Sequence, residues 1–286
     1  MTATVTPIKH GFSLSSPRFA YIKQRLDDYF ERFYDGRRQM PPDIPKKEML
    51  NRILSNDENL ARVLHEYGMR WCYARGKDRF CIEIVPPAEI QQYVYYISKY
   101  LLQSSPTLKH SYTLQGKFAE AADFLIFKHI LHYFRINIPM LFNEIPRRYG
   151  GDGGYDFHMG KFRLDPKHHD ESVGHGLFVN IKLVDKSRLD DDVIIVHNTN
   201  SASFRQGPKL NSEIMSMPID DALKSLELLN PISMVGWTTF KRFKSELAHG
   251  RVAEKKHSYC MDDVVNIKEL IRMIVEDQID EESIFG

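Results

Sequence analysis

The sequence has few cysteines. Only three occur, Cys72, Cys81 and Cys260, and no Cys-x-x-Cys pair is present. This pattern argues against a disulfide framework and against a zinc module, and it fits a reducing compartment. We therefore expect a cytoplasmic protein, in the host cytoplasm if the chain is phage-encoded, or a nuclear one if it is eukaryotic.

Long apolar runs and an excess of charge of one sign are also lacking. No run reaches the roughly 18 apolar residues of a membrane span, and the N-terminal segment has no apolar core typical of a secretory signal. We expect no membrane association. The formal net charge is only +1, so any affinity for nucleic acid must come from local basic patches.

Apolar periodicity divides the chain into three expected parts. Helical spacing predicts helices over 17–34, 46–67 (with a break near 55–57), 88–102 and from Gly116 onward. Strand patterns follow at 69–85, 177–184, 192–197 and 232–237, with helices at 220–229, 238–247 and 261–279. The polar connector 103–107 is the expected boundary. We expect a mainly helical N-terminal region for substrate or partner binding (1–107), a core (108–250), and a C-terminal amphipathic helix with an acidic tail (251–286).

The stretch Gly150–Lys167, GGDGGYDFHMGKFRLDPK, has the pattern of a β-hairpin. With Gly160-Lys161 as a two-residue turn, Phe157 faces Leu164 and Asp156 faces Asp165. Two carboxylates directly opposite each other repel unless a positive group lies between them. A divalent cation would relieve the repulsion, and Lys167 projects on the same face.

A third carboxylate lies upstream, in the helix that follows Gly116. Glu120 starts an apolar stripe through Phe124, Phe127, Leu131 and Phe134, where an inward carboxylate needs a partner. Either it complements the helix dipole or it points at the same cation as the two aspartates. His129 and His132, in the same helix, are expected to be partly buried helix residues and not metal ligands.

The order of these features resembles the PD-(D/E)XK nuclease superfamily. Over about 116–245, a helix with an inward glutamate precedes Gly-Tyr-Asp-Phe, a hairpin, and Arg163-Leu164-Asp165-Pro166-Lys167. The resemblance implies an α+β, mixed α/β fold with a restriction-endonuclease-like core, in which helices flank a mixed sheet. It implies a metal-dependent DNA endonuclease that hydrolyses phosphodiester bonds.

The resemblance also implies roles for individual residues. Asp156 is the metal-binding aspartate, Asp165 the second acid, Lys167 the lysine that aids the attacking water, and Glu120 the helix glutamate. The expected cofactor is Mg²⁺, with Mn²⁺ as a substitute, because phosphodiester hydrolysis needs a hard cation on oxygen ligands. Asp152 is a second-choice metal residue. Basic residues expected to contact nucleic acid are Arg147, Arg148, Lys161, Arg163, Arg205 and Lys209.

Alternatives remain open. Pro166 is unusual in a central strand, and Asn180-Ile181-Lys182 is a competing acid-x-lysine element with asparagine in place of the acid. DNA is the favoured substrate, but an RNA-cleaving enzyme of the same fold and an inactive nucleic-acid-binding or assembly protein are both alternatives. Cleavage of both DNA strands by a one-site chain would favour a homodimer or sequential nicking.

Overall fold

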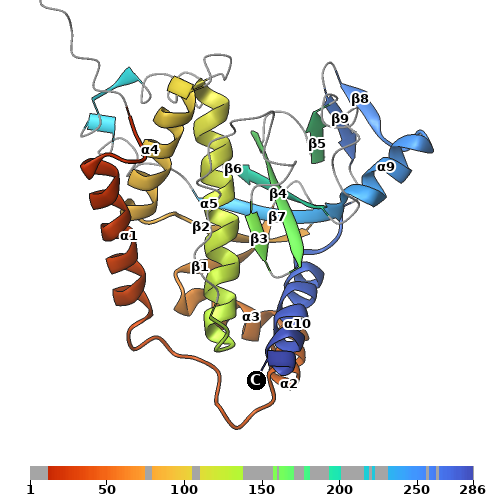
Figure 1. Cartoon of the computed structure of the whole chain (residues 1–286). Coiled ribbons are helices and arrows are strands. Elements are labelled where there is room, and N and C mark those ends of the chain that lie inside the picture. Colours follow the sequence, from red (N-terminus) through yellow and green to blue (C-terminus); the bar gives the residue numbers. More distant parts are fainter. Residues whose placement is uncertain are drawn as a thin grey trace, which may run out of the picture.

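A mixed sheet of six strands forms the centre of the protein, and helices pack around it (Figure 1). The computed structural model describes residues 12–74, 79–104, 110–137, 157–159, 161–170, 177–180, 193–200, 216–218, 221–222, 231–255, 258–261 and 264–285. Within these residues the fold is α+β, with seven helices.

The helices and strands have the following bounds. The helices are α1 (Pro17–Tyr34), α2 (Lys46–Leu54), α3 (Asp57–Glu66), α4 (Ala88–Ser104), α5 (His110–Tyr133), α9 (Phe240–Ala248) and α10 (Ile267–Phe285). The strands are β1 (Met69–Ala74), β2 (Arg79–Ile84), β3 (Phe157–Met159), β4 (Phe162–Asp170), β5 (Leu177–Asn180), β6 (Val193–Asn200), β7 (Ile232–Thr239), β8 (Ala253–Lys255) and β9 (Ser258–Met261).

Local sequence signals explain where the first helices begin and end. Ser16 caps α1 by accepting a hydrogen bond from the Phe19 backbone N–H, and Pro17 occupies the first turn. Asn56 accepts from two N–H groups in the first turn of α3, so the predicted break between α2 and α3 is confirmed. Gly36 follows α1 with a φ of 67°, a conformation that glycine adopts without strain.

The six-stranded sheet has the order β1-β2-β7-β6-β4-β3, in which only the pair β4/β6 is parallel. Strand β2 pairs with β7, so residues before the boundary expected at 103–107 share a sheet with residues of the expected core. The sequence indicates strand structure over 69–85, where β1 and β2 pair with each other, but the second partner of β2 lies far along the chain. The sheet therefore joins the two halves of the chain.

The two faces of this sheet have different chemistry. Side chains alternate between faces along a strand, and the pairing aligns them across the sheet. One face carries buried apolar residues of the main core, among them Ile82, Met234, Val196, Leu164 and Phe157. Helix α5 packs on this side, where the ring of Phe124 lies 6.0 Å from that of Phe157. We call it the α5 face.

The opposite face carries more polar residues. Strand alternation assigns Asp165 and Lys167 of β4 to it, together with Arg163 of the same strand. Across the sheet, Glu83 and Ser233 occupy this face on β2 and β7. Charged and polar groups from distant parts of the chain are therefore collected on the side of the sheet that turns away from α5.

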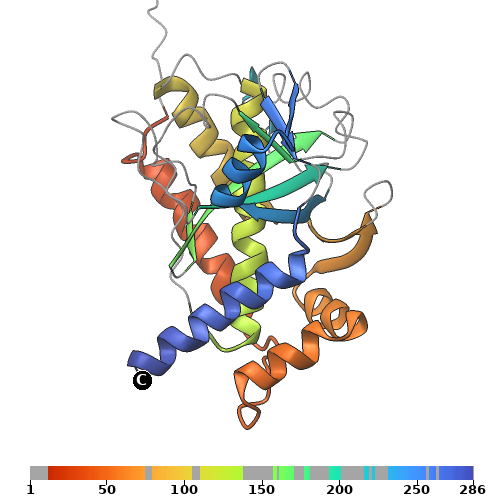
Figure 2. The same cartoon turned by 90° about the vertical axis from the view of Figure 1, so that its right-hand side faces the viewer.

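Helices α1, α4 and α5 lie side by side, and α10 packs against α2 (Figures 1 and 2). A small sheet of order β5-β9-β8 lies at the end of the molecule remote from α2. Its β8–β9 hairpin was not predicted from the sequence. Among the described residues, no helix is both long enough and apolar enough to cross a membrane.

Candidate functional site

The β3–β4 hairpin has the register that the sequence predicts. Phe157 pairs with Leu164, His158 with Arg163, and Met159 with Phe162, so two residues connect the strands. The predicted pairing of Asp156 with Asp165 is the next step of this register. Asp156 itself lies outside the described residues.

Asp165 and Lys167 form an ion pair on the face opposite α5. The Lys167 Nζ donates to Asp165 Oδ1. The Asp165 side chain is 7% exposed and that of Lys167 is 21% exposed. A carboxylate this deeply buried is costly unless a cation or donor lies beside it, and here the lysine fills that need. The two ends of the predicted acid-x-lysine element are therefore in contact.

Two further groups from the hairpin share that face. Arg163 precedes Asp165 by two residues on β4, and His158 lies directly opposite Arg163 on β3. Burial lowers the pKa of His158, and the charge of Arg163 lowers it further, so the imidazole is neutral at pH 7. The hairpin thus presents a carboxylate, two cations and a neutral imidazole on one surface.

Pro166 lies between the two members of the ion pair. It aligns with Val196 of the parallel strand β6. On the other side of β4, strand β3 begins at Phe157, which lies opposite Leu164. Proline removes a backbone donor, which is tolerated where a strand is bordered on one side only. Pro166 lies within β4 and aligns with its neighbour in β6, so the proline is compatible with the strand.

Glu120 lies in a different environment. It pairs with Lys117, one helical turn earlier on α5, and its side chain is 12% exposed. Because α5 packs on the α5 face and Asp165 projects from the opposite one, the sheet separates the two carboxylates. The structure brings each acid to its own lysine and does not bring Glu120 and Asp165 together.

A buried polar pair that was not predicted from the sequence anchors α5 to the sheet. Asn198 Nδ2 donates to Asp123 Oδ2 at 2.9 Å, and both residues are fully buried. Asn198 Oδ1 is also buried, and no hydrogen-bond partner for it lies among the described residues. An aspartate within an otherwise apolar helix segment, three residues after Glu120, was the available signal.

The remaining predicted site residues divide into two groups. Asn180 ends β5 and pairs with Ser258 in the small sheet, so it does not belong to the six-stranded sheet. Lys161 binds Asp277 of α10, with Nζ 2.5 Å from Oδ1, and this contact ties the hairpin turn to the C-terminal helix. Predicted residues outside the described parts of the chain are Arg147, Arg148, Asp152, Asp156, Lys182, Arg205 and Lys209.

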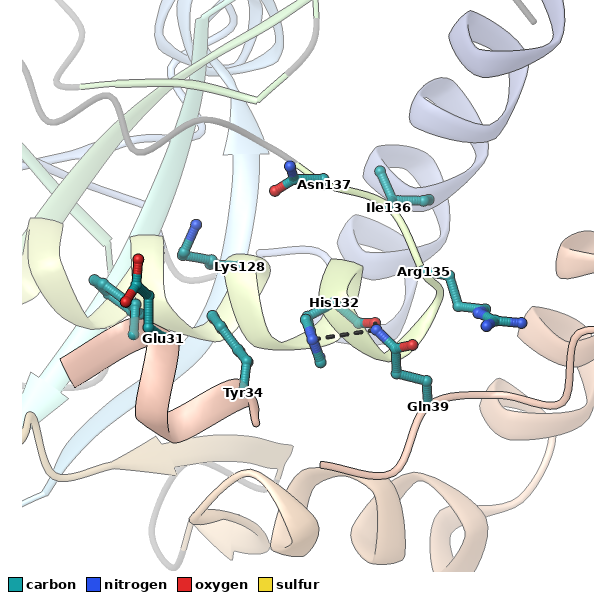
Figure 3. Close-up of a pocket in the computed structure, with 9 residues that line it drawn as sticks. Glu31, Tyr34, Gln39, Lys128, His132, Arg135, Ile136 and Asn137 are labelled. Carbon is teal, nitrogen blue, oxygen red and sulfur yellow. Dashed lines mark hydrogen bonds between the residues drawn. The ribbon is translucent and has the colours of Figure 1, made fainter. Parts of the chain in front are cut away.

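A pocket of about 470 Å³ lies elsewhere, between α1 and the C-terminal half of α5. Figure 3 shows side chains of both helices and of the connector after α1 around it, with Gln39 hydrogen-bonded to His132. Lys128 and Arg135 bring positive charge to the lining. Burial lowers the pKa of Lys128, and its Nζ lies 5.2 Å from the centre of the Phe30 ring.

The two histidines near this pocket belong to α5 and are hydrogen-bonded to tyrosines. Tyr34 Oη is 2.9 Å from His129 Nδ1, and Tyr67 Oη is 2.8 Å from His132 Nδ1. Complete burial lowers the pKa of His129 to about 3, with smaller contributions from Lys128, His132 and Arg37. His129 is therefore neutral at pH 7 and shares its hydrogen bond with Tyr34 as an uncharged ring.

Comparison with known proteins gives no relative. No protein-family model, curated protein or solved structure matches the chain.

Proposed function

We propose that the protein is a Mg²⁺-dependent nuclease that hydrolyses DNA at the face of the β3–β4 hairpin that bears Asp165 and Lys167, within a restriction-endonuclease-like core. One observation carries the proposal, namely that the hairpin pairs Phe157 with Leu164, as predicted, and that Asp165 contacts Lys167. This local geometry supports the resemblance to PD-(D/E)XK enzymes, whose sites contain two acids and a lysine in this order.

The donor set of this face suits a hard cation. Mg²⁺ prefers carboxylate oxygens and retains several of its waters, so one or two carboxylates are enough. Asp165 supplies one, and Asp156 would supply the second from across the hairpin. Bound there, Mg²⁺ would stabilise negative charge on the phosphate and lower the pKa of a water. Glu120 is left out of this ligand set because it lies across the sheet.

Each of the other groups on this face has a defined task. Lys167, which contacts Asp165, would orient the attacking water and offset charge as the phosphate becomes more negative. Arg163 bears a fixed positive charge two residues away, suited to hold a phosphate oxygen. Lys161 is engaged by Asp277, so its main task is to hold the turn.

A cleavage assay with matched variants tests the proposal. Supercoiled DNA, linear DNA and RNA are incubated with the purified chain in Mg²⁺, in Mn²⁺ and in EDTA. We expect metal-dependent cleavage of DNA that is lost in Asp156→Asn and Asp165→Asn and reduced at least about 100-fold in Lys167→Ala. Glu120→Gln is the matched control, because it alters a carboxylate of similar burial on the other side of the sheet.

Other outcomes would point to a different function. Cleavage of RNA alone would favour the RNA-cleaving alternative. Cleavage that survives Lys167→Ala and is lost in Lys182→Ala would move the site to the Asn180–Lys182 element. Absence of cleavage together with Mg²⁺ binding that does not depend on Asp165 would refute the enzyme and leave a nucleic-acid-binding or assembly protein.

A further inference from the structure

Two of the three cysteines face each other in the β1–β2 hairpin. Cys72 and Cys81 are directly paired across the strands, and their Sγ atoms are 3.5 Å apart. Glu83 follows Cys81 by two residues and so projects on the same face. One atom of each of these three side chains lies within 4.8 Å of the other two. The hairpin therefore gathers two sulfurs and a carboxylate at one point of the sheet.

We infer that Cys72, Cys81 and Glu83 form a binding site for Zn²⁺, distinct from the proposed Mg²⁺ site. Zinc accepts thiolate sulfur at about 2.3 Å and carboxylate oxygen at about 2.1 Å, so two sulfur ligands in a tetrahedron lie roughly 3.8 Å apart. The observed sulfur separation is close to this value. A disulfide would need the sulfurs about 2.05 Å apart, a larger displacement from the observed positions.

The ligand types select the metal. Two sulfurs and one carboxylate favour zinc over magnesium, which prefers oxygen ligands only. Three protein ligands leave one tetrahedral position for water. Cys81 is 1% exposed and Cys72 is partly exposed, so the site has a buried wall and an accessible side. Burial raises the pKa of both thiols, and zinc would displace their protons on binding.

The neighbours of Glu83 are compatible with this role. Arg70 Nη2 lies 2.6 Å from Glu83 Oε2, and Ser233 Oγ donates to Oε1 at 3.3 Å. The Arg70 side chain is 66% exposed, so it can turn away at small cost. Two thiolates and a carboxylate would leave the bound zinc with a net charge of about −1, which a nearby arginine offsets. Ser233 would orient the carboxylate from the adjacent strand.

The inferred site does not depend on the proposed nuclease activity. Strands β7 and β6 lie between β2 and β4, and three strand spacings amount to roughly 14 Å. A single Zn²⁺ ion cannot therefore be shared between the two sites. Bound zinc would fasten β1, an edge strand, to the rest of the sheet.

The test measures Zn²⁺ affinity by competition with a chromogenic chelator, on the full chain prepared with a non-thiol reductant. We expect one zinc per chain, and Co²⁺ in its place should give a thiolate-to-metal charge-transfer band. In Cys72→Ser we expect that band to weaken, because only the Cys81 thiolate remains, and the affinity to fall by more than the roughly 10–100-fold typical of changes outside the ligand set. Glu83→Gln should weaken binding and retain the band.

Cys260→Ser is the matched control, because it removes the third cysteine, and it should bind zinc as the unchanged chain does. Cys72 is the preferred position for substitution, since it is less buried than Cys81 and its variant is expected to fold. Circular dichroism verifies folding. Failure of the unchanged chain to bind zinc, binding that survives Cys72→Ser, or equal loss in Cys260→Ser would overturn the inference. None of these results alters the outcome expected for Asp165 in the cleavage assay.

Discussion

The hydrogen bond between Asp123 and Asn198 offers a quantitative test of how α5 is held on the sheet. Asp123 and Asn198 are both fully buried, and the bond joins the helix to β6 at 2.9 Å. An intramolecular hydrogen bond contributes about 0.5–1.5 kcal/mol, and a buried group that loses a hydrogen bond adds a desolvation cost of about 1–3 kcal/mol. We therefore expect Asn198→Ala to lower the free energy of unfolding by about 3 kcal/mol.

A double-mutant cycle separates this bond from the other contacts of the two residues. Asp123→Ala, Asn198→Ala and the double variant are unfolded in urea, and the free energies are compared at equal m-values. We expect a coupling energy of about 2 kcal/mol, because the first substitution already breaks the bond and the second then has no bond left to break. Additive effects, with a coupling energy below about 0.5 kcal/mol, would refute the view that this bond anchors the helix.

Three further predictions concern pH, backbone strain and the hairpin turn. His129 has a pKa of about 3 in the folded protein and an ordinary pKa of 6.5, so the folded state binds fewer protons than the unfolded state between these pH values. The protein should therefore lose stability progressively as the pH falls below 6.5, by up to about 5 kcal/mol. Urea titrations of His129→Leu at several pH values should lack this loss. Arg135 has a φ of 60° where α5 ends, so Arg135→Gly should raise the stability by about 1 kcal/mol in thermal unfolding and Arg135→Val should lower it. Lys161→Ala removes the cationic partner of the buried Asp277 carboxylate and should cost about 1–3 kcal/mol in urea unfolding, whereas Lys241→Ala, on an exposed position of α9, should change little.

The hairpin and the first helices could be predicted because their signals are local. A two-residue turn fixes which residues face each other, so the pairing of Phe157 with Leu164 followed from the sequence. Helix α1 has the predicted bounds, since Ser16, Pro17 and Gly36 mark its ends. Helix α5 begins earlier than predicted, at His110. Gly116, after which the helix was expected to start, lies inside it.

The arrangement of the site could not be predicted in the same way. Strand alternation assigns Leu164 and Asp165 to opposite faces of the sheet. The sequence does not say which face a helix will cover, so it could not decide whether Glu120 complements the helix dipole or points at the same cation as Asp165. The pairing of Cys72 with Cys81 was also missed, because zinc modules are recognised in sequence by cysteines that lie within one short turn. Two strands of a hairpin bring two cysteines together at a longer spacing.

The position of β7 in the sheet has a consequence for biosynthesis. This strand lies between β2 and β6, and its contact with β2 joins residues that are 150 positions apart, such as Glu83 and Ser233. A nascent chain therefore leaves β2 with an open edge until Ile232–Thr239 has left the ribosome, and pairings of such long range form slowly. Fragments that end before β7 should accordingly aggregate or recruit chaperones, and any shortened version of this chain has to retain both halves of the sheet.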